Sequence, residues 1–384
     1  MSDSHDGAGR RRRAPKRRRF LQAAGALSVS SLAGCLDVLG GDDEQRFEPG
    51  QIGSGRGGDY TPAGTPMEAM PDLSGEITVF SGRGEPLVAA LFDYMDDLYP
   101  DLTITPRYDG STALVNRIQS EGENSAADVF FSVNAGSLGQ LADAGRAGEL
   151  PSEVVDLPEE EFTDPDGMWV GTSGRARTVP YNTDTFGEGD VPNDIFAFPD
   201  AEQFDGVMGW APSYGSFQAF VTAMRILNGE EETRAWLEGM LESGVQEYGD
   251  EFTIAQRIAD GEIQAGFTNH YYIQRVLDSR PDAPLATAFT ENDAGSVFNV
   301  AGACTVDTAA DPEMAANFVR HLLSAEAQEY FIAETFEYPV IPEAEPIGDL
   351  PPVEDLQPPQ DLDLSQLADI QPTLELLREV GITV

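Results

Sequence analysis

The sequence predicts an α/β protein of two lobes, because short β-rich segments alternate with amphipathic helical segments along most of the chain. The 384 residues are two to three times the ~150 residues usual for one domain. A hydrophobic content of 41% suffices for sizeable cores. Two successive series of such segments therefore indicate two lobes, each built on a mainly parallel sheet.

The first series lies between residues 76 and 145. Residues 76–81 (EITVFS) are rich in β-branched and aromatic side chains and are bounded by glycines, which predicts a strand. From Glu85 onward, apolar residues recur at helical spacing. The segments that follow are a strand at 102–106, a helix at 111–121 with Ser111 as candidate N-cap, a strand at 127–131 and a helix at 135–145.

The second series begins after residue 178. It contains a strand at 207–211, helices at 216–228 and 231–242, and a strand at 263–267 that runs into Tyr271 and Tyr272. A strand at 297–306, helices at 312–323 and 325–334, and an amphipathic segment at 364–380 complete the chain. Ligands in such sheets bind at the carboxyl ends of strands, so we expect a ligand in a cleft between the lobes.

The N-terminal residues resemble an export signal. A twin-arginine pair at Arg17-Arg18 and Arg19-Phe20-Leu21 precede a short apolar stretch, as in Tat signals, and Leu32-Ala33-Gly34-Cys35 matches a lipobox. We expect residues 1–34 to be removed and Cys35 to be lipidated. We expect the protein to be anchored by lipid to the outer face of the cytoplasmic membrane. Residues 35–75, rich in Gly, Asp, Glu and Pro, are predicted to be a flexible linker.

The chain is strongly acidic, with 67 acidic and 23 basic residues and a formal net charge of -44. Lys16 is its only lysine. Carboxylates hold water and cations, so this composition indicates adaptation to high salt. The charge would repel phosphate backbones and anionic lipids, which excludes nucleic acid as a partner and leaves the lipid anchor as the membrane contact. We expect a monomer.

The composition also argues against an enzyme. Beyond the leader only His270 and His321 are present, and the sequence contains no His-Glu-x-x-His, Gly-x-Ser-x-Gly or P-loop motif. With Cys35 assigned to lipid, Cys304 has no disulfide partner, and its apolar surroundings in sequence predict a buried thiol.

Three loops after strands are candidates for ligand binding. In the first, two phenol oxygens from Tyr271 and Tyr272 could converge on a hard cation such as Fe(III), although an adjacent tyrosine pair is often simple packing. In the second, residues 213–216 open a helix whose backbone N–H groups could bind an anion or could form an ordinary capped terminus. In the third, after the first strand, Arg83 and Glu85 are the polar candidates.

Five segments together resemble the ferric-iron-binding proteins of ABC importers, over roughly residues 75–384. They are residues 77–83, 127–131, 173–182, 265–272 and 337–340, and the most specific element is Asn269-His270-Tyr271-Tyr272. The resemblance implies a type II periplasmic-binding-protein (Venus flytrap) fold with crossing hinge strands near 177–181 and 297–300. It implies one lobe from 76–178 and 299–338, and a second lobe from 179–298 and 339–384.

The resemblance also implies roles for individual residues. Tyr271 and Tyr272 would ligate Fe(III), the transported ligand. Asn269 and the loop from Ser213 through Tyr214 and Gly215 to Ser216 would hold a synergistic anion such as carbonate or phosphate. In some family members an arginine holds that anion, which makes Arg175 a candidate here. The loaded protein would deliver its cargo to an ABC permease and its ATPase.

The chain departs from this pattern at positions that matter for metal binding. Gly84 stands where many members have a histidine ligand, and Val133 stands where some have a glutamate. A third tyrosine of another subgroup falls closest to Phe217, and Tyr214 could replace it only if the loop differs. We expect His270 to lie beside the ligands or to face solvent.

These departures leave alternatives open. The same fold could bind an organic solute such as thiamine, a phosphonate, a polyamine or an organic anion, with Tyr271 and Tyr272 stacking on a flat cation. A secreted hydrolase is a more distant alternative.

Overall fold

The computed structural model describes residues 62–384, except the side chains of Ser365 and Ala368. The predicted twin-arginine signal, the lipobox with Cys35 and the linker up to residue 61 lie outside the described residues. Among the residues that are described, no helix combines the length and the apolar character needed to cross a membrane.

The described chain alternates strands and helices, as the sequence predicts. The strands are β1 (Gly75–Ser81), β2 (Leu102–Tyr108), β3 (Val129–Ser132), β4 (Ala147–Gly148), β5 (Val170–Asn182), β6 (Met208–Trp210), β7 (Gln246–Glu247), β8 (Ala265–Gly266), β9 (Thr268–Asn269), β10 (Leu285–Ala288) and β11 (Phe298–Val306). The α-helices are α1 (Glu85–Leu98), α2 (Ser111–Glu121), α3 (Ala135–Asp143), α4 (Ser152–Val155), α5 (Gly215–Asn228), α6 (Glu230–Glu242), α7 (Glu251–Ala259), α8 (His270–Ser279), α9 (Pro312–His321), α10 (Ala325–Ala333) and α11 (Gln371–Glu379). No helix was expected from the sequence at α4 or at α7.

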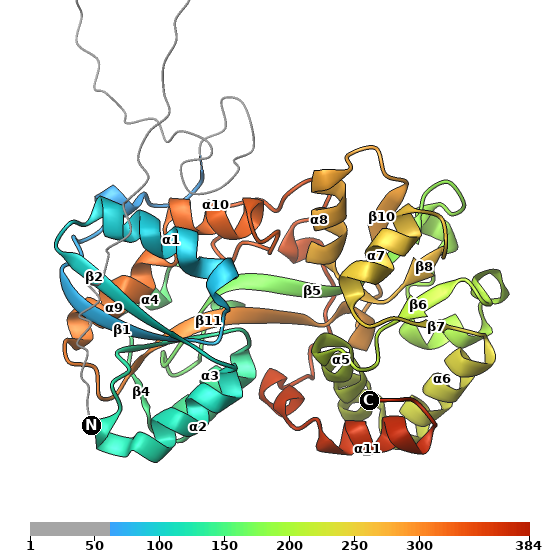
Figure 1. Cartoon of the computed structure of the whole chain (residues 1–384), viewed down its shortest axis with the longest axis horizontal. Coiled ribbons are helices and arrows are strands. Elements are labelled where there is room, and N and C mark those ends of the chain that lie inside the picture. The colour runs from blue at the N-terminus through green and yellow to red at the C-terminus, as the bar shows by residue number, and fades with distance from the viewer. Residues whose placement is uncertain (1–61) are drawn as a thin grey trace, which may run out of the picture. The chain divides into compact units, whose positions relative to one another are not determined.

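The strands form a sheet in the order β2-β1-β3-β11-β5-β8-β6-β7. β1 pairs in parallel with β2 and β3, and β6 pairs in parallel with β7 and β8. β5 pairs antiparallel with β11 at one end and with β8, β9 and β10 at the other. Figure 1 shows β5 and β11 running together between helices α1–α3 and helices α5–α8. These two strands are the crossing strands of a two-lobed α/β fold.

Two large hydrophobic cores lie on either side of the crossing strands, and a smaller cluster accompanies each of them. The first core packs around β1, β2, β3, α1 and α9, and the second packs around β6, α5, α6 and α11. β5 contributes to both, since Val170 and Ala176 belong to the first core and Val179 and Tyr181 to the second. We refer to the elements around each core as the first and the second lobe.

The predicted linker is wrong for its last residues. Met67, Met70 and Leu73 are buried, and Met67 begins a short 3-10 helix, η1 (Met67–Ala69). The Met67 backbone N–H donates to the Glu326 carboxylate at 2.9 Å, and the Tyr99 hydroxyl donates to the Met67 carbonyl at 2.9 Å. The acidic, glycine-rich composition predicted a linker here. Three apolar side chains, each three residues apart, are nevertheless enough to anchor the segment.

The C-terminal part also differs from the expected division. Val340, Ile341 and Leu350 pack in the first core, although the resemblance implied that residues from 339 belong to the second lobe. Leu364 contacts both cores, and the chain reaches the second core with Leu362, η9 (Leu364–Ala368) and α11.

Ser111 is not the N-cap of α2, which begins after Gly110 in extended backbone conformation. The Ser111 hydroxyl oxygen instead accepts the Val133 backbone N–H at 3.1 Å, and so joins the start of α2 to the end of β3. A Cβ atom at Gly82 would lie 2.0 Å from the Ser111 hydroxyl oxygen, so only glycine allows this close approach. The two strand ends of the first lobe are thereby held together at the edge of the cleft.

Candidate functional site

A cavity of about 540 Å³ lies between the two lobes. Its walls come from the starts of α2 and α3, the crossing strands, the starts of α5 and α8, and η9 with the residues after it. The lining residues that carry polar groups are Thr112, Asn134, Ser137, Arg175, Arg177, Tyr214, Ser216, Asn269, Tyr271, Tyr272 and Asn299. The lining residues include no Asp or Glu among the described side chains, although the chain has 67 acidic residues.

Three tyrosines meet in this cavity. β9 pairs with β5 and then turns directly into α8, which places Tyr271 and Tyr272 in the first turn of that helix with ring centroids 4.4 Å apart. Tyr214 is the N-cap residue of α5, and its phenol oxygen lies 2.5 Å from the phenol oxygen of Tyr272. A tyrosine from a second helix thus completes a cluster of three phenol groups.

The phenols of the pair on α8 are protonated in the absence of a cation. Burial raises the pKa of Tyr272, and the neighbouring phenols of Tyr271 and Tyr214 raise it further. Burial also raises the pKa of Tyr271, although Arg175 and hydrogen bonds from Tyr272 and Asn269 oppose this shift. A bound trivalent cation would reverse the balance, because its charge favours phenolate.

Asn269 lies at the end of β9 and acts on the tyrosines directly. Its side-chain Nδ2–H donates to the Tyr271 phenol oxygen at 3.1 Å. A hydrogen bond to the oxygen stabilises phenolate more than phenol, so this contact favours metal binding. Asn269 was expected to bind an anion, but in this structure its side-chain amide binds the Tyr271 phenol oxygen.

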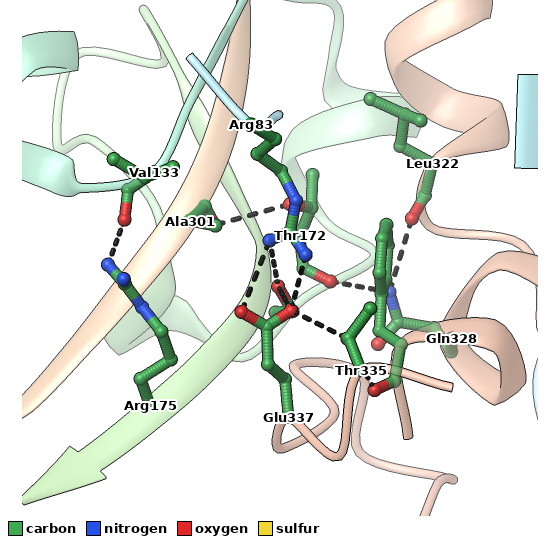
Figure 2. A network of polar contacts seen from close by, with 11 residues as sticks. Arg83, Val133, Thr172, Arg175, Ala301, Leu322, Gln328, Thr335 and Glu337 are labelled. Atoms are coloured by element: carbon green, nitrogen blue, oxygen red, sulfur yellow. Dashed lines mark hydrogen bonds and ion pairs between the residues drawn. The ribbon is translucent and has the colours of Figure 1, made fainter. Parts of the chain in front are cut away.

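Arg175 reaches from β5 to the first lobe. It lines the cavity, and its guanidinium donates to the backbone carbonyl of Val133, which follows β3. Figure 2 shows this contact beside the crossing strands. Arg175 thus joins the crossing strand β5 to the residue after β3, and it supplies positive charge at the cavity wall.

Two of the expected anion-binding residues lie away from the cavity lining. Ser213 is exposed and does not line it, whereas Gly215 and Ser216 do. Arg83 is only 1% exposed and pairs with Glu337 at 2.6 Å (Figure 2), with an additional hydrogen bond to Ser173 at 2.9 Å. The Arg83 prediction is therefore wrong, because a buried carboxylate in the first lobe already engages the guanidinium.

The third tyrosine is Tyr214. Phe217 is fully buried in the second core and packs against Trp210. Because α5 begins at Gly215, the N-cap position of Tyr214 directs its ring to Tyr272 instead, with centroids 6.2 Å apart. The loop geometry that the sequence could not supply therefore decides which aromatic residue enters the site.

His270 does not face solvent. It is fully buried, its Nδ1 accepts the Ala176 backbone N–H at 3.1 Å, and its ring packs on Tyr338 with centroids 4.7 Å apart. Burial lowers the pKa of His270 to about 4, so the ring is neutral. His270 therefore anchors the start of α8 to β5, beside the tyrosine pair as expected. Gly84, at the start of α1, is exposed and does not line the cavity.

Sequence reasoning missed a buried ion pair next to the tyrosines. Arg177 on β5 and Glu251 at the start of α7 are 3% and 0% exposed and are joined by a short ion pair. The signal was available in part, because Asp250 caps α7 by accepting the Thr253 N–H at 2.8 Å. The contribution of Leu364, Leu367 and Ile370 to the cavity wall had no comparable sequence signal.

Within residues 62–384, no group of three or more His, Cys, Asp and Glu side chains is arranged to hold a metal ion. The cluster of phenol oxygens is a different kind of donor set. Two oxygens that are cis ligands of one octahedral metal at about 2.05 Å lie about 2.9 Å apart. The separation of 2.5 Å between the Tyr214 and Tyr272 oxygens is close to this value, so both can reach one ion with small side-chain movements.

A cavity between two lobes that are joined by crossing strands defines a protein that binds a small solute in its cleft. The family described as bacterial extracellular solute-binding protein matches residues 91–356. The chain belongs to this family.

Named relatives are consistent with this class. The chain is 33% identical over 286 residues to iron uptake protein A2 of Synechocystis sp., which covers 70% of this chain and 80% of the relative. It is 28% identical over 297 residues to the major ferric iron-binding protein of Neisseria meningitidis, covering 73% and 87%. The structure of iron-bound HitA from Pseudomonas aeruginosa aligns with a TM-score of 0.69 and 27% identity, over 81% of this chain and 100% of that one. These relatives are named as binding and uptake proteins rather than as enzymes.

Proposed function

We propose that this protein captures Fe(III) in the cleft between its lobes and delivers it to an ABC permease. The observation that carries the proposal is the meeting of three phenol oxygens, from Tyr214, Tyr271 and Tyr272, in one cavity. One relative is named as a major ferric iron-binding protein and HitA, which shares the fold, was solved with bound iron, which supports iron as the cargo.

The chemistry of the site favours a small trivalent cation. Phenolate is a hard, charged oxygen donor, and three phenolates neutralise the charge of one Fe(III) ion. Divalent ions such as Ca²⁺ and Mg²⁺ prefer carboxylate, carbonyl and water ligands, and the described lining residues include no carboxylate. The cavity would therefore discriminate against the cations that the acidic surface attracts.

The remaining coordination positions would be filled from outside the chain. The first lobe offers Gly84 and Val133 where related proteins have side-chain ligands, and it contributes Thr112, Asn134 and Ser137 to the cavity. Arg175 provides a positive charge on that side. A water molecule, carbonate, phosphate or the carboxylate of a small chelator beside Arg175 fits this arrangement.

The leader supports an outward-facing location. The twin-arginine segment and the lipobox ending at Cys35 would export the folded chain and anchor it to the outer face of the cytoplasmic membrane. The net charge of -44 suits a protein that works in high salt. The chain would act as a monomer that passes its cargo to a permease powered by an ATPase.

A titration with visible absorption tests the iron site. The full chain with Cys35→Ser, which prevents lipidation, is titrated with chelated Fe(III) in molar salt. We expect a phenolate-to-iron charge-transfer band that is reduced in Tyr271→Phe and in Tyr272→Phe. Tyr248→Phe is the matched control, because the Tyr248 hydroxyl bonds Gln246 and Tyr248 does not line the cavity. A folded wild-type protein that shows no band would refute the proposal.

A further inference from the structure

The carboxylate of Glu251 lies at the junction of the elements that form the second-lobe side of the site. Glu251 is the first residue of α7 and is fully buried. One of its oxygens accepts the Ser216 hydroxyl at 2.6 Å and also pairs with the Arg177 guanidinium. The other oxygen accepts the backbone N–H of Asn269 at 3.0 Å.

These donors belong to the elements that would be expected to hold an exogenous anion. Ser216 lies in the first turn of α5, where backbone N–H groups and the helix dipole favour negative charge. A serine hydroxyl has a single proton to donate, and that of Ser216 goes to Glu251. The side-chain amide of Asn269 is likewise engaged, since it donates to the Tyr271 phenol oxygen.

The charge at this position is also already balanced. The Arg177 guanidinium lies over the rings of Phe217 and Phe220, at 5.8 and 5.0 Å from their centroids, where water does not screen it. Its Nη1 pairs with Glu251, whereas its buried Nε and Nη2 have no hydrogen-bond partner. An oxyanion at the start of α5 would have to compete with the Glu251 carboxylate for the Ser216 hydroxyl and for the Arg177 guanidinium.

We propose that Glu251 is a built-in anion that occupies the anion position at the start of α5 and excludes carbonate or phosphate from it. The inference rests on the proposed iron function for its purpose, but it makes its own claim about the apo-protein. Glu251 is a positioning residue: through Ser216 and Asn269 it holds the start of α5 and the tyrosine pair together. Any exogenous ligand of the iron then approaches from the Arg175 side.

The test measures phosphate binding to the iron-free protein by calorimetry. Four full-length proteins are compared in the Cys35→Ser background: wild type, Ser216→Ala, Glu251→Gln and the double variant. We expect Ser216→Ala to leave any phosphate affinity of the wild type unchanged. Glu251→Gln removes the negative charge that pairs with Arg177 and weakens the hydrogen bond from Ser216, so we expect it to bind phosphate about tenfold or more tightly than wild type, a gain that the double variant loses.

Glu262→Gln is the matched control, because it removes a carboxylate from an exposed ion pair with Arg257 outside the cavity. We expect this variant to bind phosphate as the wild type does. The inference is overturned if Ser216→Ala weakens phosphate binding in the presence of Glu251, or if folded Glu251→Gln gains no affinity. If Glu251→Gln fails to fold, the comparison of wild type with Ser216→Ala still decides.

A second readout separates this inference from the iron function. Absence of a charge-transfer band in the wild type would refute the iron site and would leave the phosphate result standing. If the band is present, phosphate should shift it in Glu251→Gln, and the shift should disappear when Ser216 is also replaced. A structural role alone would change unfolding but not this anion response.

Discussion

Tyr214→Phe should remove one of three phenolate ligands while preserving the fold. The substitution deletes one oxygen, which lies 2.5 Å from the Tyr272 phenol oxygen, and keeps the ring at its place against Tyr272. A phenol is a weak acid and a phenolate is the form that ligates Fe(III), so each tyrosine that becomes a ligand must release one proton. The number of protons released therefore counts the tyrosine ligands.

The expected magnitude follows from that count. Wild type should release about three tyrosine protons per iron and Tyr214→Phe about two, so the iron affinity should rise with pH about one power of ten less steeply per pH unit in the variant. The charge-transfer band should fall to about two thirds of its wild-type intensity for the same reason. Affinity should decrease in acid for both proteins, since the raised pKa values of Tyr271 and Tyr272 mean that protons compete with the metal.

The assay is calorimetric titration with the same ferric chelate in several buffers of different ionisation enthalpy, with absorption recorded in parallel. Protons taken up by the chelator cancel in the difference between wild type and variant. Tyr248→Phe should behave as wild type. A Tyr214→Phe protein with unchanged proton release and band intensity would show that Tyr214 only hydrogen-bonds to Tyr272 and is not a ligand.

Three further outcomes test other parts of the structure. Asn269→Ala should weaken iron binding about tenfold or more in the absorption titration, because a hydrogen bond to a charged oxygen is worth about 1.5–3 kcal/mol; an unchanged affinity would contradict this role. Glu337→Ala should lower the free energy of unfolding by about 3–5 kcal/mol in denaturant titrations near neutral pH, because it leaves the Arg83 charge buried without its partner. Burial alone would raise the pKa of Glu337, but Arg83 and Arg175 hold it below its usual value, so this stability is present above the unfolded pKa and is lost as the pH falls through the folded one; equal acid sensitivity of variant and wild type would refute the assignment. Cys304 is fully buried and burial raises the pKa of its thiol to about 12, so a thiol reagent at pH 8 should modify it only after unfolding; rapid labelling of the native protein would contradict the structure.

Local patterns predicted most of the fold because the strands and helices carry strong periodicity. The segment from β1 to α3 appears as expected, within a few residues at each end. The errors lie where a few contacts outweigh composition. Residues 62–73 read as linker, yet Met67 is held by Glu326 and Tyr99, which are distant in sequence.

The site was predicted in part for a related reason. The tyrosine pair follows a strand, and this position was visible in the sequence. The role of Tyr214 depends on α5 beginning at Gly215, directly after it. Sequence patterns locate helix boundaries only to within one or two residues. Arg83 and Glu251 show the same limit: whether a charged residue binds a ligand or another side chain depends on which partner, far away in sequence, the fold brings to it.

The contrast between the surface and the cavity explains how an acidic protein can select a ferric ion. A net charge of -44 attracts every cation, and exposed carboxylates bind divalent ions without discrimination. The cavity instead presents phenols, which remain neutral until a cation displaces their protons, and burial makes that displacement costly. An ion binds strongly only if its attraction to the phenolates exceeds the free-energy cost of removing several protons. This favours Fe(III) over Mg²⁺ and Ca²⁺. The pairing of Arg177 with Glu251 supports this selection. Arg177 neutralises the carboxylate of Glu251, which could otherwise hold a divalent ion beside the tyrosines.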